Sequence, residues 1–425
     1  MSRGKKSKRK AAFLRRFLAS LGPGIIVGAA DDDPSGIATF SIAGAQHGLA
    51  LLWTALLTWP LMAFVQMMCA RIGMVTGRGL VGALRKRLPH PVLMVLAFAL
   101  FAANSINVGA DLSGMADAAE MLTRINSHLF VVVFAVAISL AMIFLKYHQV
   151  ANALKWLCLV LFAYVVTGFI IHPSWSQIAR ATFVPSWPKS HAQWGMLVAL
   201  LGTTISPYLF FWQASQEVEE EKAMGRRMLA RRFGATPKEL IDRKIDIDLG
   251  AFFSNLVMYF VILTTALTLH RHGITDIKTS KDAAQALYPL AGKFAGTLFT
   301  LAIIGVGLLA IPTLTGSAGY ALAETFARRE GLDQRFRGAR FFYIVMIIST
   351  LVGVALDLLN VNPVQALYWS AVINGLLAPV LLVLIIFVSR DRTVMRDQPS
   401  SIPSVVVVSI ATLLMFGAAI GMFVI

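Results

Sequence analysis

The chain has 425 residues, of which 57% are hydrophobic and only 14% are charged, and its net charge is +16. A soluble protein carries roughly 25% charged residues, so this composition excludes an ordinary soluble domain and favours a polytopic, all-α membrane protein. The basic excess is explained below by membrane topology, and we therefore expect no nucleic-acid partner.

Eleven apolar segments of membrane-spanning character follow a basic N-terminal tail at 1–21. Their predicted ranges are about 22–43, 49–70, 92–116, 129–145, 152–171, 194–214, 249–269, 294–325, 341–356, 365–389 and 402–424. The connection at 216–248 is charged and partly helical in character. Most other connections are short, which predicts one compact bundle embedded in the lipid bilayer.

The distribution of basic residues predicts the orientation of this bundle. With the N-terminus inside, 31 of the 38 Lys and Arg residues fall on the cytoplasmic side, as the positive-inside rule requires. We therefore expect a multi-pass protein of the bacterial inner (plasma) membrane. Its N-terminus would be cytoplasmic and its C-terminus extracytoplasmic.

Two spans are interrupted near their middle by proline, the first at Pro34 and the sixth at Pro207. The two breaks lie in the first and sixth spans, so they are five spans apart. Because five is an odd number, a five-span unit that is repeated once has opposite membrane orientations in its two copies. Such inverted repeats with broken helices are typical of secondary transporters. We predict repeats at about 22–171 and 194–389, followed by a cytoplasmic link and an eleventh membrane helix at 390–425.

Three consecutive aspartates, Asp31 to Asp33, precede the first proline. An ionised aspartate at the centre of a span costs about 2.5–3.5 kcal/mol on insertion scales. No Lys or Arg lies in the middle of any predicted span, and all eight histidines lie at span ends or in loops. Water, protonation or an external cation must therefore compensate the charge. Asp33 is the candidate ligand, whereas Asp31 and Asp32 would line a vestibule.

Oxygen donors also gather at the second break, in the stretch GTTISPY. Its hydroxyls belong to Thr203, Thr204 and Ser206, and the proline frees backbone carbonyls. We expect Thr204 to bond back to its own helix and Ser206 to face the site. Oxygen-only sites suit hard cations such as Mg²⁺, Ca²⁺ or Mn²⁺.

Polar residues elsewhere in the spans give weaker signals. Asp111 is an acid without an obvious partner and is a candidate for a proton or water pathway. Asn374 is a candidate to hydrogen-bond the site or a hydrating water. Gln213, which continues the sixth span beyond its break, is a further candidate for the proton or water pathway.

Two stretches carry a family resemblance. GPGIIVGAADDDPSGIATFSIAGAQHGLALLW at 22–53 resembles the first span and following turn of the Nramp family of divalent-metal transporters, whose pattern there is Asp-Pro-Gly-Asn. TLTGSAGYALAETF at 313–326 resembles the eighth span of that family. The resemblance covers nearly the whole chain. It implies a LeuT-like fold, with two inverted five-helix repeats and the ion between unwound first and sixth helices.

The resemblance also implies individual ligands. The metal aspartate of the family falls on Asp33, and its two carbonyl ligands fall on Ala30 and Thr203. The residues of the chain that depart from the family pattern are Ser35 (Gly in the family), Gly36 (Asn), Gly114 (Glu), Ser206 (Met), Tyr208 (His), Gln213 (His) and Ala371 (Gln), whereas Asp111 matches. A thioether and an amide ligand are thus missing, and the proton route of the family is interrupted.

Fewer direct ligands imply a roomier site, which suits an ion that keeps part of its hydration shell. Mg²⁺ dehydrates reluctantly, and the motif is similar to the Nramp-related magnesium transporter branch. We therefore expect a monomeric secondary transporter that moves Mg²⁺, and also Mn²⁺, by alternating access. The cation would be its substrate, no cofactor is implied, and transport need not be tightly coupled to protons.

Three alternatives remain at this point. A proton-coupled Mn²⁺/Fe²⁺ importer would tolerate the changed ligands. An amino-acid transporter on the same fold would present helix N-termini to a carboxylate, which three aspartates would repel. An intramembrane metalloenzyme would need histidine-rich ligands within a span, which the sequence lacks.

Overall fold

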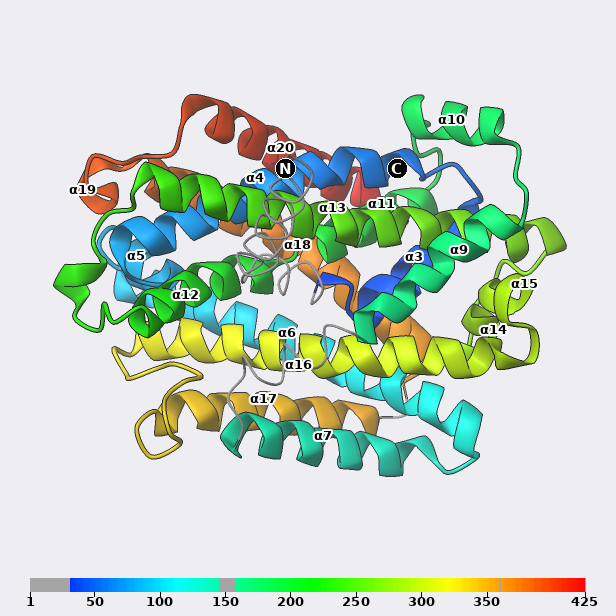
Figure 1. Cartoon of the computed structure of the whole chain (residues 1–425), viewed down its shortest axis with the longest axis horizontal. Coiled ribbons are helices and arrows are strands. Elements are labelled where there is room, and N and C mark those ends of the chain that lie inside the picture. Colours follow the sequence, from blue (N-terminus) through cyan, green and yellow to red (C-terminus); the bar gives the residue numbers. More distant parts are fainter. Residues whose placement is uncertain (1–30, 145–156, 360, 425) are drawn as a thin grey trace, which may run out of the picture.

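The computed structural model describes residues 31–144, 157–359 and 361–424, and this part of the chain contains helices but no strand. Most of the long helices run roughly parallel or antiparallel to one another, whereas α3 and α9 lie obliquely to them (Figure 1). They are α3 (Pro34–His47), α4 (Trp53–Thr76), α6 (His90–Thr123), α7 (Ser127–Phe144), α9 (Phe162–Ile170), α11 (His191–Thr204), α12 (Pro207–Ala223), α13 (Pro237–Thr268), α16 (Ala295–Thr325), α17 (Arg340–Asp357), α18 (Pro363–Arg390) and α20 (Ile402–Val424).

Short helices connect these long ones. They are α5 (Leu80–Leu84), η1 (Leu157–Leu161), α10 (Trp175–Phe183), η2 (Leu229–Arg232), η3 (His270–His272), α14 (Ser280–Ala284), η4 (Gln285–Leu287), α15 (Tyr288–Ala291), η5 (Gly292–Phe294) and α19 (Arg392–Met395).

The all-α fold class is confirmed, and the predicted spans agree with the helices. Nine helical segments in the described part of the chain are long and apolar enough to cross a membrane. The first and fifth predicted spans are described only from residues 31 and 157 onward, so Ala30 lies outside the described residues. The helices that extend furthest beyond their predicted ranges are α12, which continues to Ala223, and α13, which already begins at Pro237.

All connections with clustered Lys and Arg lie at one end of the bundle, which we call the basic end. These connections are 77–89, 224–236, 326–339 and 391–401. The basic end carries α5 and α19, and the opposite end carries α10, α14 and α15 (Figure 1). The described chain therefore has the charge asymmetry that the positive-inside rule describes.

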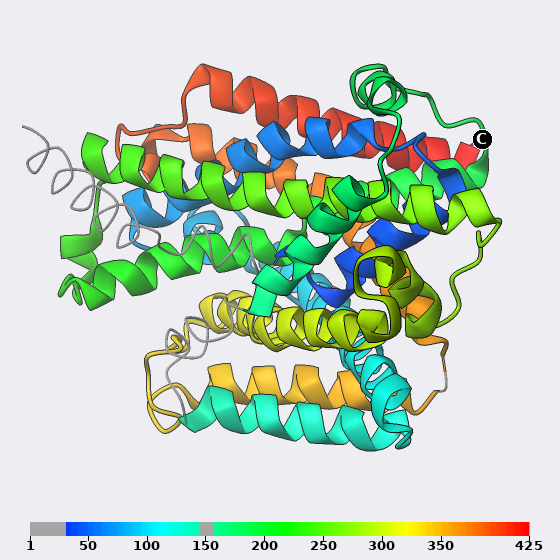
Figure 2. The ribbon, with the colours of Figure 1, turned by 45° about the vertical axis from the view of Figure 1, so that its right-hand side comes forward.

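The broken helices lie inside the bundle. Helix α3 packs against α13, α18 and α11, and all residues of α11 from Gly195 to Thr204 are buried. In contrast, α7 and α17 lie side by side at the edge of the molecule (Figures 1 and 2) and present exposed apolar side chains. An exposed apolar face of this kind suits lipid rather than water.

Both breaks have local causes in the sequence. Pro34 and Pro207 occupy the first turns of α3 and α12, where the missing N–H of proline costs no hydrogen bond. The preceding residues Asp33 and Ser206 are extended, with ψ of 168° and 133°, as expected before proline. Each proline therefore starts a new helix and leaves unwound backbone ahead of it.

Candidate functional site

Asp33 caps the N-terminus of α3. Its Oδ1 accepts hydrogen bonds from the backbone N–H of Gly36 at 2.6 Å and from the hydroxyl of Ser35 at 2.9 Å. A carboxylate in this position satisfies free N–H groups and interacts favourably with the positive end of the helix dipole. The sequence thus folds into a break at which an ionised aspartate stabilises the helix start.

Helix α6 supplies the second wall of the site. Asn107 donates its side-chain N–H to Oδ2 of Asp33 at 3.0 Å. One turn later, Asp111 accepts the backbone N–H of Ser35 through Oδ1 at 3.2 Å, while its buried Oδ2 has no hydrogen-bond partner in the described structure. The structure therefore brings Asp111 to the same break as Asp33.

The other two aspartates face α13. The hydroxyl of Ser254 lies 2.7 Å from Oδ2 of Asp31 and 3.1 Å from Oδ1 of Asp32. A hydroxyl has one proton and cannot donate to both carboxylates at once. Asp31 is only 1% exposed, and its Oδ1 has no partner among the described residues. This pair therefore keeps unsatisfied acceptor capacity within the bundle.

The break between α11 and α12 lies opposite α3. A Cβ atom built at Gly36 would be 3.0 Å from Oγ1 of Thr203 and 3.3 Å from Oδ1 of Asp33. Gly36 therefore lets α3 approach the second break, and the Thr203 hydroxyl, which has no partner in the described structure, lies near Asp33. The two predicted breaks are brought together.

The hydroxyls of the second break differ in their bonding. Thr204 bonds back to the carbonyl of Leu200 at 2.7 Å, as expected. Ser206 also bonds back, to the carbonyls of Thr203 at 2.7 Å and Gly202 at 2.9 Å. Because these bonds use its proton, the oxygen of Ser206 keeps its lone pairs for another ligand. The Thr203 carbonyl likewise keeps one of its two lone pairs.

The remaining candidates surround this centre. Tyr208 follows Pro207 in the first turn of α12 and is fully buried. Asn374 lies on α18 between Ala371 and Gly375, which closely approach Gly202, and its buried Oδ1 has no partner in the described part of the chain. Gln213 points its N–H away from the centre, to Oε1 of Glu217 at 2.6 Å.

Among the described residues, no basic side chain pairs with these carboxylates. None of the ion pairs among the described residues involves Asp31, Asp32, Asp33 or Asp111. In that same part of the chain, no group of three or more His, Cys, Asp or Glu side chains converges closely enough to surround a metal ion. These carboxylates can therefore bind a cation through few direct protein ligands, and water molecules would complete its coordination shell.

Sequence reasoning missed Ser254 entirely. Its signal was a polar pair, Ser254-Asn255, within the apolar stretch AFFSNLVMYF. It also assigned no role to Asn107, which contacts Asp33 directly. Asn104, one turn earlier, has a structural role, because it donates to the carbonyl of Leu314 and the hydroxyl of Ser317 on α16, both at 2.8 Å.

Comparison with known proteins identifies relatives. The model of the family described as "Nramp: Natural resistance-associated macrophage protein-like" matches residues 24–425. A divalent metal cation transporter MntH of Yersinia pestis is 27% identical over 372 residues, which cover 85% of this chain and 84% of the relative. The MntH of Pectobacterium carotovorum is also 27% identical, over 318 residues and 73% of each chain.

Solved structures show the same fold. The Eremococcus coleocola manganese transporter, in complex with an aromatic bis-isothiourea substituted compound, has a TM-score of 0.75 at 18% identity, covering 97% of this chain and 89% of that chain. Mhp1, a nucleobase-cation-symport-1 family transporter, has a TM-score of 0.56 at 14% identity, covering 94% and 92%. The fold is therefore LeuT-like, as expected.

Proposed function

We propose that this chain, which belongs to the Nramp family, moves a divalent metal cation across a membrane and binds it at Asp33. The main support for this proposal is a set of four buried carboxylates, which belong to Asp31, Asp32, Asp33 and Asp111. None of them has a basic partner among the described residues. Family membership excludes the enzyme alternative, because the relatives are transporters.

The proposed ligands are Asp33, the hydroxyl or carbonyl oxygen of Thr203, and the oxygen of Ser206, together with the carbonyl of Ala30. Asp31, Asp32, Ser35, Gly36, Tyr208 and Asn374 would line the surrounding vestibule. The oxygen-only donor set and the small number of direct ligands support Mg²⁺ as substrate, with Mn²⁺ also carried. The names of the relatives, which are divalent metal and manganese transporters, support Mn²⁺.

Transport would proceed by alternating access in a monomer. We assign the moving parts to inverted repeats at 22–171 and 194–389, with 390–425 as an added link and helix. The basic end would face the cytoplasm of a bacterial inner membrane, following the positive-inside rule. The two helix breaks would then lie near the middle of the bilayer, where such transporters bind their ions.

A proton-coupled Mn²⁺/Fe²⁺ importer is the second candidate. Asp111, whose Oδ2 has no partner in the described structure, favours it as a proton acceptor. Gly114 argues against it: a Cβ at this position would lie 2.9 Å from Cδ1 of Leu367. Leucine thus occupies the space that the glutamate of the family would need, and Gln213 replaces a titratable histidine. We therefore propose transport without tight proton coupling.

Uptake into proteoliposomes tests this proposal directly. We expect Mg²⁺ and Mn²⁺ to enter along their gradients while the interior pH stays constant, because Gly114 and Gln213 replace titratable residues of the family's proton route. A magnesium dye, radioactive Mn²⁺ and an internal pH dye measure the three quantities. Uptake of Mn²⁺ or Fe²⁺ without Mg²⁺, accompanied by acidification, would instead establish the proton-coupled importer.

The Asn107→Ala variant tests the site assignment. Because Asn107 orients the carboxylate of Asp33, we expect about a 10- to 100-fold loss of cation affinity, the usual effect of removing the partner of a metal ligand. Saturation curves of uptake measure it. Asn104→Ala is the matched control, since it also removes a buried hydrogen bond of α6 but one to α16. An equal loss of affinity in both variants would show that the effect is structural.

A further inference from the structure

A second acidic pocket lies at the basic end, between α12 and the start of α13. Its volume is about 210 Å³. A water molecule takes about 30 Å³ of liquid volume, so the pocket can hold a cation together with its water shell. Its walls come from α12, from α13 and from Met74 near the end of α4.

Negative charge dominates this pocket. Five carboxylates line it against two guanidinium groups, in a chain whose net charge is +16. The carboxylates belong to Glu217, Glu220, Glu221, Glu239 and Asp242, and the guanidinium groups to Arg226 and Arg243. Lys and Arg predominate at this end of the molecule, so its surface is positive on the whole. The negatively charged pocket nevertheless attracts cations locally.

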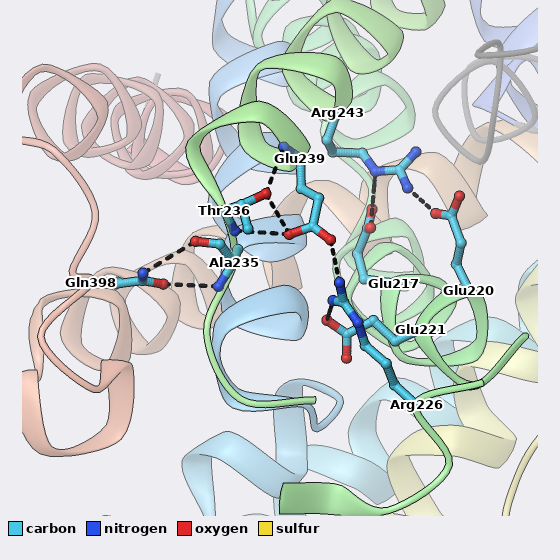
Figure 3. A network of polar contacts seen from close by, with 9 residues as sticks. All are labelled: Glu217, Glu220, Glu221, Arg226, Ala235, Thr236, Glu239, Arg243 and Gln398. Atoms are coloured by element: carbon cyan, nitrogen blue, oxygen red, sulfur yellow. Dashed lines mark hydrogen bonds and ion pairs between the residues drawn. The ribbon is translucent and has the colours of Figure 1, made fainter. Parts of the chain in front are cut away.

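Two guanidinium groups cannot neutralise five carboxylates, although Figure 3 shows each arginine paired with two of the glutamates. Arg243 is shared between Glu217 at 2.7 Å, Glu220, and the nearby Asp246 at 2.7 Å. Arg226 pairs with Glu239 at 2.6 Å and more distantly with Glu221 at 3.7 Å. Asp242 is exposed and takes no part in the ion pairs of the described residues.

Glu221 points to a missing ligand. It is only 5% exposed, and its Oε2 is buried without a hydrogen-bond partner in the described structure. Its other oxygen, Oε1, forms a long ion pair with Arg226 at 3.7 Å, so only Oε2 is left without a donor. A buried carboxylate oxygen without a donor is costly, and a cation with bound water supplies the missing donors.

We propose that this pocket binds a hydrated divalent cation. The ion would keep its water shell, because the described side chains do not form a group that surrounds a bare metal. Mg²⁺ suits this mode best, since it dehydrates reluctantly. Water molecules of the shell would donate to Glu221 and Asp242, while Glu217 and Glu239 remain paired with the arginines.

The pocket is connected to the broken helix. Gln213 of α12 donates to Glu217 at 2.6 Å, and Arg243 of α13 holds that same carboxylate. An ion bound between α12 and α13 would therefore tie the second half of the broken helix to its neighbour. This inference goes beyond the proposed function and does not rest on it, because the pocket would bind a cation whether or not Asp33 does.

Equilibrium binding of Mn²⁺ to the full chain in lipid nanodiscs tests the proposal, with free Mn²⁺ measured by electron paramagnetic resonance. We expect Asp33→Asn to retain one class of Mn²⁺ sites. In the Asp33→Asn background, adding Glu221→Gln and Asp242→Asn should weaken that class at least about tenfold, in line with the energies of close charge pairs. Asp248→Asn in the same background is the control, since Asp248 lies on α13 outside the pocket.

Each outcome decides between the sites. Loss of all Mn²⁺ binding in Asp33→Asn alone would overturn the pocket while leaving the central site in place. Loss of all binding in the Glu221→Gln, Asp242→Asn variant with intact Asp33 would support the pocket and contradict the central site. Hexaamminecobalt(III), which does not exchange its ligands, should displace Mn²⁺ from the pocket. Its failure to compete would overturn binding of a hydrated ion.

Discussion

Replacing Asp33 with Asn is expected to reduce cation uptake by at least about 100-fold while the protein still folds. The carboxylate of Asp33 is the proposed ligand that lies at the N-terminus of α3 beside the second break. Partners of a metal ligand are alone worth about 10- to 100-fold, so removal of the charged ligand itself should cost at least that much. Uptake of Mg²⁺ and Mn²⁺ into proteoliposomes measures the effect.

Asn is chosen because it separates charge from structure. Its side-chain oxygen can still accept the N–H of Gly36, and Asn is as good an N-cap as Asp. Size-exclusion profiles and melting temperature should therefore stay close to those of the unaltered chain. A variant that folds normally and still transports at an undiminished rate would contradict the assignment of Asp33 as the ion ligand.

The helices could be predicted from hydropathy, but some of their ends could not. Hydropathy predicted the sixth span to end near 214, whereas α12 continues to Ala223. The added residues EVEEEK are mostly Glu and Lys, which are good helix formers, and Arg243 of α13 pairs with two of these glutamates, Glu217 and Glu220. Such pairing across helices is invisible in a hydropathy profile. The start of α13 did have a local signal, because Thr236 and Glu239 form a capping box around Pro237.

The candidate site was predictable in its centre and less so in its walls. The free-energy cost of an ionised aspartate within a span indicated Asp31 to Asp33. The matching positions of Pro34 and Pro207 in their spans indicated the second break. The pairing of Asp31 and Asp32 with Ser254 depends on how α3 packs against α13, which one sequence does not determine. Likewise, Asn104 and Asn107 are the same residue type on the same helix. Only the rotation of α6 about its axis decides which of them faces Asp33.

Replacing Gly202 with Ala is expected to destabilise the protein by at least about 3 kcal/mol and to abolish transport. A Cβ at Gly202 would lie 2.2 Å from the carbonyl oxygen of Ala371 and 2.3 Å from the backbone N of Gly375. Backbone atoms cannot move aside as a flexible side chain does, so α11 and α18 must separate. The expected loss lies at the upper end of overpacking costs, and thermal unfolding in detergent measures it.

Transport should fail for the same reason, because Gly202 immediately precedes Thr203. Small residues let membrane helices approach backbone to backbone, and here this approach fixes the position of the second break opposite Asp33. Gly417→Ala is the control: no atom lies within 4 Å of a Cβ at Gly417 on α20, and alanine favours a helix over glycine by about 1 kcal/mol. Normal stability and uptake in Gly202→Ala would refute the close contact between α11 and α18, and with it the proposed position of Thr203.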